Sequence, residues 1–444
     1  MTLLVANNGT WGRVSITLLF LAVNHSDDRA NLDENNFNNT TRNAMKLVNQ
    51  IQDKVKRHQE RRVSTGLHFV IADSIRYIPQ QAWKKIVEHQ SLFMSLEYLN
   101  TIEAHSPENS QQRYAMAFEQ GKPVVAVVCQ VAQINGGNFY KPANKLQTLV
   151  AEKYQERILV CGNLVSSGLH GVAFDPELDE DRVWRIVAEM LYKIRRGEQL
   201  GGTIDFVMLK DLKGGQINRS SMLERYSYRK IQTDPDMVLQ LDETIQCFDD
   251  YLASLTSKYR SRCKKIITSV EAAGYRCEKL PVDPIMDKRL HQLYLQVENK
   301  SQVRLATLPQ GYFYALSQIL GDKFCCYGIK TDAHLAGFIS IVKDGDSAVA
   351  YYVGVDYQVN KEVPVYFRLL QLVIESAIEM GCQRISFGRT ASEPKANLGA
   401  KPVDSYVWVR HRVPLVNFVI RKLFRSVPYE EAPERTVIRQ EKDD

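Results

Sequence analysis

The apolar and polar positions between residues 113 and 208 predict four strands and one helix. Strands are expected where valine-rich or alternating segments occur, at residues 113–119, 124–131, 157–161 and 203–208. A helix is expected between the last two, because apolar residues recur at steps of three and four: Val183, Ile186, Met190 and Ile194. It begins in the acidic stretch 176–181 and ends at Gly197.

The same order of elements is predicted a second time, between residues 324 and 387. The expected strands are residues 324–330, 335–342, 348–355 and 383–387. A helix before the last strand has one apolar stripe, formed by Tyr366, Leu370, Val373, Ala377 and Met380, with Pro364 near its start and Gly381 just past its end. Three strands, a helix and a strand, twice in one chain, indicate two domains of one fold.

A long helix is predicted between the two repeats, at residues 248–273, from apolar positions at steps of three and four. Five of the eight positions from 258 to 265 are basic: Lys258, Arg260, Arg262, Lys264 and Lys265. Such a run forms either a solvated helix face or a face that contacts phosphates of a tRNA-linked or nucleotide-linked substrate. Both interpretations stay open on the sequence.

Composition narrows the class of protein. The chain has 444 residues, 44% of them hydrophobic, so it can bury a full core. Lys and Arg number 57 against 51 for Asp and Glu, and this excess of +6 does not by itself imply binding to nucleic acid.

The eight cysteines include no CxxC pair, so they are expected to be reduced thiols, mostly buried. The neighbours Cys325 and Cys326 are read as core-strand positions, with a redox or metal site as the alternative.

The N-terminal apolar run, residues 15–23, is about half as long as a membrane-spanning helix. We expect no transmembrane segment. The run resembles the apolar part of a signal peptide, but no cleavage pattern follows it, so a cytoplasmic location is expected. Residues 27–41 are expected to form a loop or disordered connector, and the charged tail after Tyr429 is expected to be disordered.

Motifs in the second repeat resemble those of the FemAB-like acyltransferases. They are residues 387–395 (FGRTASEPK), 398–402 (LGAKP), 351–356 (YYVGVD), and 251–255 with 258–260 (YLASL and KYR). The repeated element order also resembles the core of the GNAT superfamily of N-acyltransferases. The resemblance covers roughly residues 65–420. It implies an α/β (α+β) fold of two tandem GNAT-like domains, each a mixed sheet flanked by helices.

The block from Gly388 to Pro402 follows a strand, where open α/β sheets place their ligand crevices. Ser392 is expected to cap a short helix over residues 393–398, which Gly399 ends. Arg389 is then a candidate to bind a carboxylate or phosphate, and Lys395 a candidate to stabilise an oxyanion. The alternative is an internal network of ion pairs that holds the loop.

Acyl transfer to an amine also needs a proton acceptor, and Glu393 and Asp356 are the candidates. Each is otherwise a cap or a carboxylate that holds a loop in place. Tyr352 is a candidate proton donor to the leaving group, or else a packing residue of a core strand. No Ser-His-Asp or Cys-His pattern is visible, so we expect direct attack by the amine.

These observations lead to one main hypothesis and one alternative. The chain is an N-acyltransferase or aminoacyltransferase; alternatively, it is a catalytically inactive GNAT-like binding protein. The catalytic candidates are Glu393, Lys395, Tyr352 and Asp356, and the substrate-binding candidates are Arg389, Lys258, Arg260 and Arg262. We expect no metal and no permanently bound cofactor, an amine of a small molecule or cell-envelope precursor as acceptor, and tRNA as a further candidate partner. The expected domains are a variable segment 1–64, GNAT-like domains 65–235 and 236–428, and a tail 429–444.

The acyl donor is expected to be aminoacyl-tRNA or an acyl-CoA. GNAT enzymes grip the pyrophosphate of coenzyme A with a glycine-containing loop at the start of the long helix. One matching segment here is residues 356–364, which contain no glycine and include Pro364, a residue without an amide N–H. The other is residues 166–181, which end in an acidic helix start that would repel a pyrophosphate. The sequence therefore predicts weak coenzyme A binding and favours aminoacyl-tRNA.

Overall fold

The computed structural model describes residues 2–7, 10–15, 59, 63–135, 155–301, 305–425, 433 and 435–439. The chain divides into two compact units, residues 1–63 and 64–444. In the first unit, strands β1 (Thr2–Asn7) and β2 (Thr10–Ser15) pair as an antiparallel hairpin. Apart from Ser15, the predicted apolar run 15–23 and the connector 27–41 lie outside the described residues.

The second unit contains one mixed sheet of thirteen strands within the described residues. Its strands are β3 (His68–Ala72), β4 (Ser110–Glu119), β5 (Lys122–Asn135), β6 (Gln155–Cys161), β7 (Val172–Phe174), β8 (Phe206–Lys213), β9 (Arg229–Gln240), β10 (Arg276–Lys279), β11 (Phe324–Lys330), β12 (Leu335–Asp344), β13 (Ser347–Val355), β14 (Arg384–Ser386) and β15 (Lys401–His411). All eight predicted strands are confirmed, with ends that differ by a few residues.

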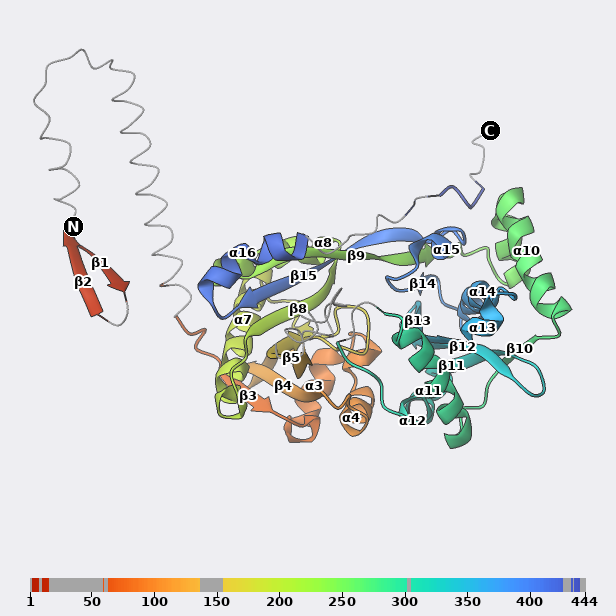
Figure 1. Cartoon of the computed structure of the whole chain (residues 1–444). Coiled ribbons are helices and arrows are strands. Elements are labelled where there is room, and N and C mark those ends of the chain that lie inside the picture. The colour runs from red at the N-terminus through yellow and green to blue at the C-terminus, as the bar shows by residue number, and fades with distance from the viewer. Residues whose placement is uncertain are drawn as a thin grey trace, which may run out of the picture. The chain divides into compact units, whose positions relative to one another are not determined.

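Two runs of the sheet share one connectivity, as the sequence predicted. β4, β5 and β6 pair antiparallel in chain order and β6 then pairs parallel with β8; β11, β12, β13 and β14 repeat this arrangement. The strand order is β10-β11-β12-β13-β14-β9-β15-β8-β6-β5-β4-β3, so β9 and β15 lie between the two repeats and join them into one sheet (Figure 1). The domain limits 65–235 and 236–428 remain a prediction.

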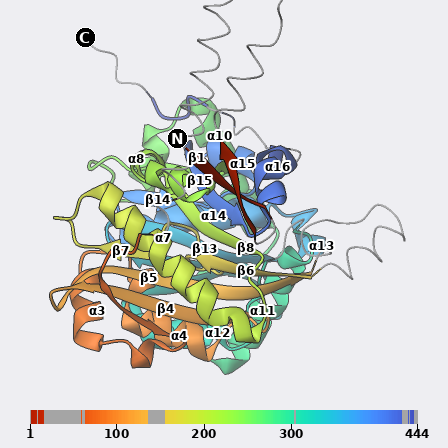
Figure 2. The same ribbon diagram turned by 90° about the vertical axis from the view of Figure 1, so that its left-hand side faces the viewer.

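Helices cover both faces of this sheet (Figure 2). The helices of the second unit are α3 (Gln80–Val87), α4 (Leu96–Ala104), α7 (Glu180–Gly197), α8 (Gly215–Arg219), α9 (Phe248–Ser254), α10 (Ser257–Ala272), α11 (Pro284–Glu298), α12 (Tyr312–Leu320), α13 (Tyr357–Asn360), α14 (Val365–Glu379), α15 (Ser392–Ala396) and α16 (Pro414–Arg425). Short 3-10 helices are η1 (Ile75–Tyr77), η2 (Leu92–Met94), η3 (Glu198–Gly201), η4 (Ser221–Tyr226) and η5 (Gly321–Lys323).

Three large apolar clusters fill the space between these layers. One cluster joins residues of α3, α4, α11 and α12 with residues of both repeats, among them Met116 of β4 and Phe338 of β12. A second lies under α7, and a third under α14 and α10. Successive strand residues alternate between clusters, as a pleated strand requires. Cys326 faces the shared cluster and Cys325 the one under α14, which supports the reading of this pair as core-strand positions.

The predicted helix at residues 248–273 is two helices, so the expectation of one continuous helix is wrong. α9 ends at Ser254 and α10 begins at Ser257, and the C-terminal tail contacts the chain between them. Leu255 forms a β-bridge with Ile438, and the Thr256 amide donates to the Val437 carbonyl at 2.9 Å. Backbone groups used by the tail cannot join an uninterrupted helical ladder. The tail is therefore ordered at residues 435–439, which also corrects its expected disorder.

The remaining expectations concern cysteines and membrane segments. All eight cysteines are free thiols; six are buried, Cys277 is half-buried and Cys247 is exposed. Within the described residues, no helix combines the length and the apolar character that crossing a membrane would require.

Candidate functional site

The parallel strands of each repeat separate at a corresponding point. In the second repeat, the pairing of β13 with β14 ends at Val349 and Ser386. In the first repeat, the pairing of β6 with β8 ends at Cys161 and Leu209. The segments that continue from these ends carry charged side chains, and the structure brings them together at the junction of the two repeats.

Asp211 is one of two acids of this junction that have no exposed surface. It lies in β8 with a φ of 64°, where the register between β8 and β15 shifts by one residue. Such a bulge turns a side chain out of its regular direction. The Asp211 carboxylate accepts a hydrogen bond from the Gly168 amide at 3.0 Å, and it forms ion pairs with Lys210, whose Nζ lies 2.6 Å away, and with Arg389 from beyond β14.

Asp236 of β9 is a second fully buried carboxylate at the junction. Its Oδ2 accepts a hydrogen bond from Ser386 Oγ of β14 at 2.7 Å and pairs with Lys213 of β8. Asp236 thus connects strands of both repeats. Its second oxygen, Oδ1, has no hydrogen-bond partner among the described residues.

Lys210 holds a loop of the first repeat, residues 162–171, against the junction. Its ammonium donates to the carbonyls of Asn163 at 2.8 Å and Ser166 at 2.5 Å. Burial lowers the pKa of Lys210 well below its ordinary value, and the charges of Arg389 and Lys213 lower it further. Gly162 is required at the start of this loop, because a Cβ there would lie 2.6 Å from Lys210 Cγ.

The same loop contacts a tyrosine cluster that belongs to both repeats. The Tyr351 hydroxyl lies 2.9 Å from that of Tyr98 and 2.5 Å from that of Tyr312. Asn163 Nδ2 donates to the Tyr98 hydroxyl at 2.9 Å. Tyr352, the predicted proton donor, is largely enclosed by aromatic rings and donates its hydroxyl hydrogen to the Val165 carbonyl at 2.9 Å. Burial raises the pKa of Tyr352 well above its ordinary value.

His170 ends the loop and is buried against the Phe93 ring, with 4.4 Å between the ring centroids. Its Nε2 lies 2.8 Å from the Ser167 carbonyl, whereas its Nδ1 has no partner among the described residues, and neither has Ser167 Oγ. Burial lowers the pKa of His170 to about 4. Polar atoms buried without a partner are rare, and they mark places where water or a ligand is bound.

The structure brings two of the predicted residues, Arg389 and Lys395, to this junction. Lys395 is 3% exposed, and its ammonium donates to the carbonyls of Gly388 at 3.0 Å and Thr390 at 2.5 Å. Burial lowers the pKa of Lys395 to about 8, against the opposing effect of the nearby Asp236 charge. Two of the three N–H groups of the ammonium are used by these carbonyls.

Glu393, in contrast, is exposed and pairs with Arg435 of the tail at 2.8 Å. The expected cap of its helix is also different. Ala391, with a φ of 54°, occupies the N-cap position, and Ser392 lies inside α15 with its hydroxyl unpartnered among the described residues. The prediction that Ser392 caps the helix is therefore wrong, whereas Gly399 follows α15 with a φ of 85°, as expected.

The contacts of Asp356 fit its alternative role, that of a helix cap, and not the role of a proton acceptor. Its carboxylate accepts from the Gln358 amide at 2.9 Å and caps α13, and it lies 3.2 Å from His334 Nε2. The candidate residues Lys258, Arg260 and Arg262 lie on α10, at the outer end of the second repeat (Figure 1). Lys258 and Arg262 are exposed, and Arg260 is half-buried.

The amides around the start of α14 already have acceptors within the protein. The Gln358 amide donates to Asp356, the Val363 amide to the Val359 carbonyl, and the Tyr366 amide to Asn360 Oδ1 at 2.9 Å. At the start of α7, Asp179 accepts from the Arg182 amide, with Glu180 and Asp181 in the first turn. These contacts occupy several of the amides that a pyrophosphate would use, and the acids in the first turn of α7 oppose a bound anion.

Sequence reasoning missed Lys210, Asp211, Lys213 and Asp236. The signal was present, because Lys210 and Asp211 interrupt an apolar strand, and charged residues are rarely buried unless they are paired. Together the junction residues Lys210, Lys213, Arg389 and Lys395 outnumber the two aspartates. Such an excess of cationic donors suits a bound carboxylate, phosphate or oxyanion.

Comparison with known proteins identifies the fold. Residues 257–396 match the family described as an acetyltransferase (GNAT) domain. The crystal structure of FemX, 11% identical, matches 79% of this chain and 99% of its own with a TM-score of 0.50. A tandem GNAT protein from the clavulanic acid biosynthesis pathway, 11% identical, matches 78% of this chain and 99% of its own with a TM-score of 0.46.

The structure of L-PGS from Bacillus licheniformis, 12% identical, matches 73% of this chain and 95% of its own with a TM-score of 0.43. Among curated proteins, none matches this sequence. The repeated connectivity, the fold shared with FemX and the match over residues 257–396 agree with one another. Residues 257–396 therefore form a region similar to the GNAT acetyltransferase domain, and the chain shares its fold with FemX.

Proposed function

We propose that the chain is an N-acyltransferase or aminoacyltransferase whose chemistry takes place at the junction of the two repeats. The observation that carries this proposal is the buried charge network of Asp211, Asp236, Arg389 and Lys395. The network lies where β13 and β14 separate. Arg389 and Lys395 fall within the region that matches the GNAT domain, residues 257–396. Acyl transfer to an amine passes through a tetrahedral oxyanion, and preorganised cationic donors stabilise such a charge best in a buried site.

Two residues of the network have roles in this proposal. Lys395 donates its remaining N–H to the developing oxyanion, and Arg389 orients a carboxylate or phosphate of a substrate. The amine attacks the acyl carbon, the C–N bond forms, and the bond to the leaving oxygen or sulfur breaks. The proton that the amine loses goes to a carboxylate, and the proton that the leaving group needs comes from a nearby acid or from water.

Asp236 is our preferred proton acceptor. Its Oδ1 is without a hydrogen-bond partner in the described part of the chain, and it belongs to the network that includes Lys395. Glu393 is exposed and paired with Arg435, and Asp356 caps α13, so the contacts of these two earlier candidates favour structural roles. The Tyr352 hydroxyl is already engaged with the Val165 carbonyl and would need to exchange that bond to protonate a leaving group.

For the donor, we propose aminoacyl-tRNA in preference to an acyl-CoA. The amides at the start of α14 are used within the protein, which removes the usual contact for the pyrophosphate of coenzyme A. The basic residues Lys258, Arg260 and Arg262 of α10 offer a surface that would meet RNA phosphates. The acceptor would be an amine of a small molecule or of a cell-envelope precursor.

The test is a transfer assay with charged tRNA and with acetyl-coenzyme A, offered to a panel of amines and read by mass spectrometry of the product. We expect product with charged tRNA, and a loss of roughly 100-fold in rate for Lys395→Met, the size found when an oxyanion donor is removed. Lys401→Met, a change of an exposed lysine on β15, is the matched control and should keep full activity.

The inactive binding protein is the competing outcome of this assay. A ligand that binds in a manner dependent on Arg389 and Lys395, with no product from any donor and amine, would favour it. Native mass spectrometry of the protein purified from its host would then show which molecule occupies the junction.

A further inference from the structure

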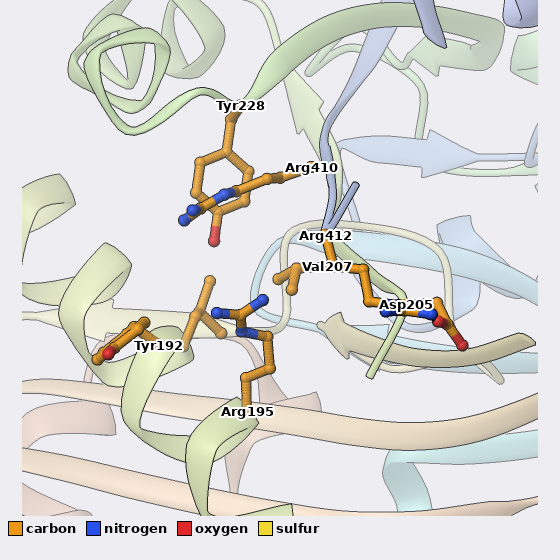
Figure 3. A pocket seen from close by; sticks show the side chains of 8 residues that line it. Tyr192, Arg195, Asp205, Val207, Tyr228, Arg410 and Arg412 are labelled. Carbon is orange, nitrogen blue, oxygen red and sulfur yellow. The ribbon is translucent and has the colours of Figure 1, made fainter. Parts of the chain in front are cut away.

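A small pocket in the first repeat is lined by three arginines, two of which, Arg195 and Arg410, have no acidic partner among the described residues. It lies between α7 and β15, and its cavity of about 10 Å³ has room for roughly one oxygen atom. Figure 3 shows Arg195 of α7 and Arg410 of β15 on two sides of it, with Tyr228 between them. Leu191, Tyr192, Asp205, Val207 and Arg412 complete the lining.

The charges around this pocket do not balance. The one acid in its lining, Asp205, pairs with Arg412, whose Nε lies 2.5 Å from Asp205 Oδ1. Within the described residues, neither Arg195 nor Arg410 forms an ion pair, and each instead lies near an aromatic ring, Tyr192 and Tyr228 respectively. Burial lowers the pKa of Arg195, and the positive charge of Arg410, which lines the same pocket, lowers it further.

Tyr228 adds a neutral donor to the two charged ones. Its ring is 2% exposed and lies under the Arg410 guanidinium, 5.9 Å from Arg410 Cζ to the ring centroid. The hydroxyl points toward Arg195 in Figure 3, and no residue in the described part of the chain forms a hydrogen bond with it. Three donor groups, from α7, from the residue that precedes β9 and from β15, thus converge on one small space, and the acid in its lining, Asp205, is already paired.

We propose that this pocket binds a phosphate group, with Arg195, Arg410 and Tyr228 as its ligands. Guanidinium groups present planar forks of N–H donors that match phosphate oxygens, and the bound charge would remove the repulsion between the two arginines. One phosphate oxygen would occupy the cavity and accept a hydrogen bond from the Tyr228 hydroxyl, and the other oxygens would remain at the cavity mouth, where the two forks donate to them. This site is separate from the junction, and the proposal does not rest on acyl transfer.

A soluble phosphate ester and a phospholipid head group present the same chemistry to these residues. The surface next to the pocket bears on the choice between them. Two apolar residues of α16, Leu415 and Phe418, are 75% and 76% exposed, and α16 begins two residues after Arg412. Basic residues beside exposed apolar ones on a helix are typical of contact with an anionic membrane surface.

The test is binding of inorganic phosphate, measured by calorimetry on the full chain. We expect saturable binding that weakens by roughly tenfold or more in Arg195→Gln and in Arg410→Gln, since a hydrogen bond to a charged group contributes that much. Tyr228→Phe should weaken it by a smaller factor, because the ring under Arg410 remains. Arg76→Gln, at an exposed arginine of η1, removes the same charge elsewhere and should leave phosphate binding unchanged.

Sedimentation with vesicles of phosphatidylglycerol, against vesicles of phosphatidylcholine, separates the two sources. Binding to the anionic vesicles that is lost in Leu415→Ser with Phe418→Ser, while phosphate still binds, identifies a lipid head group. Phosphate binding without vesicle binding identifies a soluble ester. The proposal is overturned if phosphate does not bind, or if it binds equally well to the double variant Arg195→Gln, Arg410→Gln. Neither result depends on turnover, so failure here leaves the proposed acyl transfer untouched.

Discussion

Arg389 and Asp211 form an ion pair across the two repeats, although 177 residues separate them in the chain. Arg389 follows β14, and Asp211 lies in the bulge of β8 with no exposed surface. The pair therefore connects the end of one repeat to the end of the other. Its loss would leave a buried carboxylate with fewer compensating charges.

Arg389→Met is expected to lower the free energy of unfolding by about 3 kcal/mol, the cost of removing one partner of a buried ion pair. Urea denaturation followed by circular dichroism measures it. Asp211→Asn combined with Arg389→Met should recover part of the loss, because the uncompensated charge is then absent. A cost below about 1 kcal/mol for the single variant would show that Lys210 alone balances Asp211.

Lys395 should make stability depend on pH in a defined window. Its pKa is lowered to about 8 in the folded chain, against 10.5 for the ordinary group, so the unfolded chain binds more protons between these values. The free energy of unfolding attributable to Lys395 therefore rises as the pH increases from about 8 toward 10.5, by up to about 3 kcal/mol.

Urea denaturation of the wild type and of Lys395→Met between pH 7.5 and about 9.5 isolates this contribution, because the other titrating groups are common to both proteins. The difference in unfolding free energy between the two should change with pH in the direction stated. A constant difference would mean that the ammonium is not perturbed by burial.

Truncation after residue 432 should destabilise the chain by about 2–3 kcal/mol, because it removes the buried Val437 from the cluster under α14 and breaks the contacts at Leu255 and Thr256. Thermal denaturation measures the loss. Truncation after residue 439 keeps all of these contacts and is the control. Equal stability of both truncated forms with the full chain would contradict the assigned role of the tail.

Acetyl-coenzyme A should give no saturable heat in a calorimetric titration with the wild-type chain. The physical reason is that amides at the start of α14 already donate to Asp356, Val359 and Asn360. A tight, stoichiometric response that disappears when residues 358–361 are changed would overturn this prediction. It would also make acyl-CoA the preferred donor for the proposed reaction.

Periodicity predicted the repeated strands and both long helices because each has one buried face, and a buried face leaves a regular apolar pattern. The strand pair β9 and β15 was not predicted, since β9 contains the sequence Asp234-Pro235-Asp236, which interrupts any alternation. Nor was the break at Leu255, which depends on residues of the tail about 180 positions later. Local patterns do not contain such distant contacts.

The site was predicted only in part, for a related reason. Arg389 and Lys395 stood out through their motif, and the structure places both in the junction network. Glu393 lies in the same motif, yet its side chain turns outward to Arg435, a residue of the tail. Asp236 is one of two acids in its own strand, and its importance depends on Lys213 and Ser386 from two other strands.

The position of β9 and β15 has a practical consequence for anyone who wishes to produce one repeat alone. β15 pairs with β8 of the first repeat on one side and with β9 on the other, and β9 pairs with β14 of the second. A chain cut near residue 235 would expose long strand edges in both fragments, and exposed edges recruit further strands from other molecules. Each fragment should therefore aggregate when expressed singly, and the two should be soluble when they are produced together.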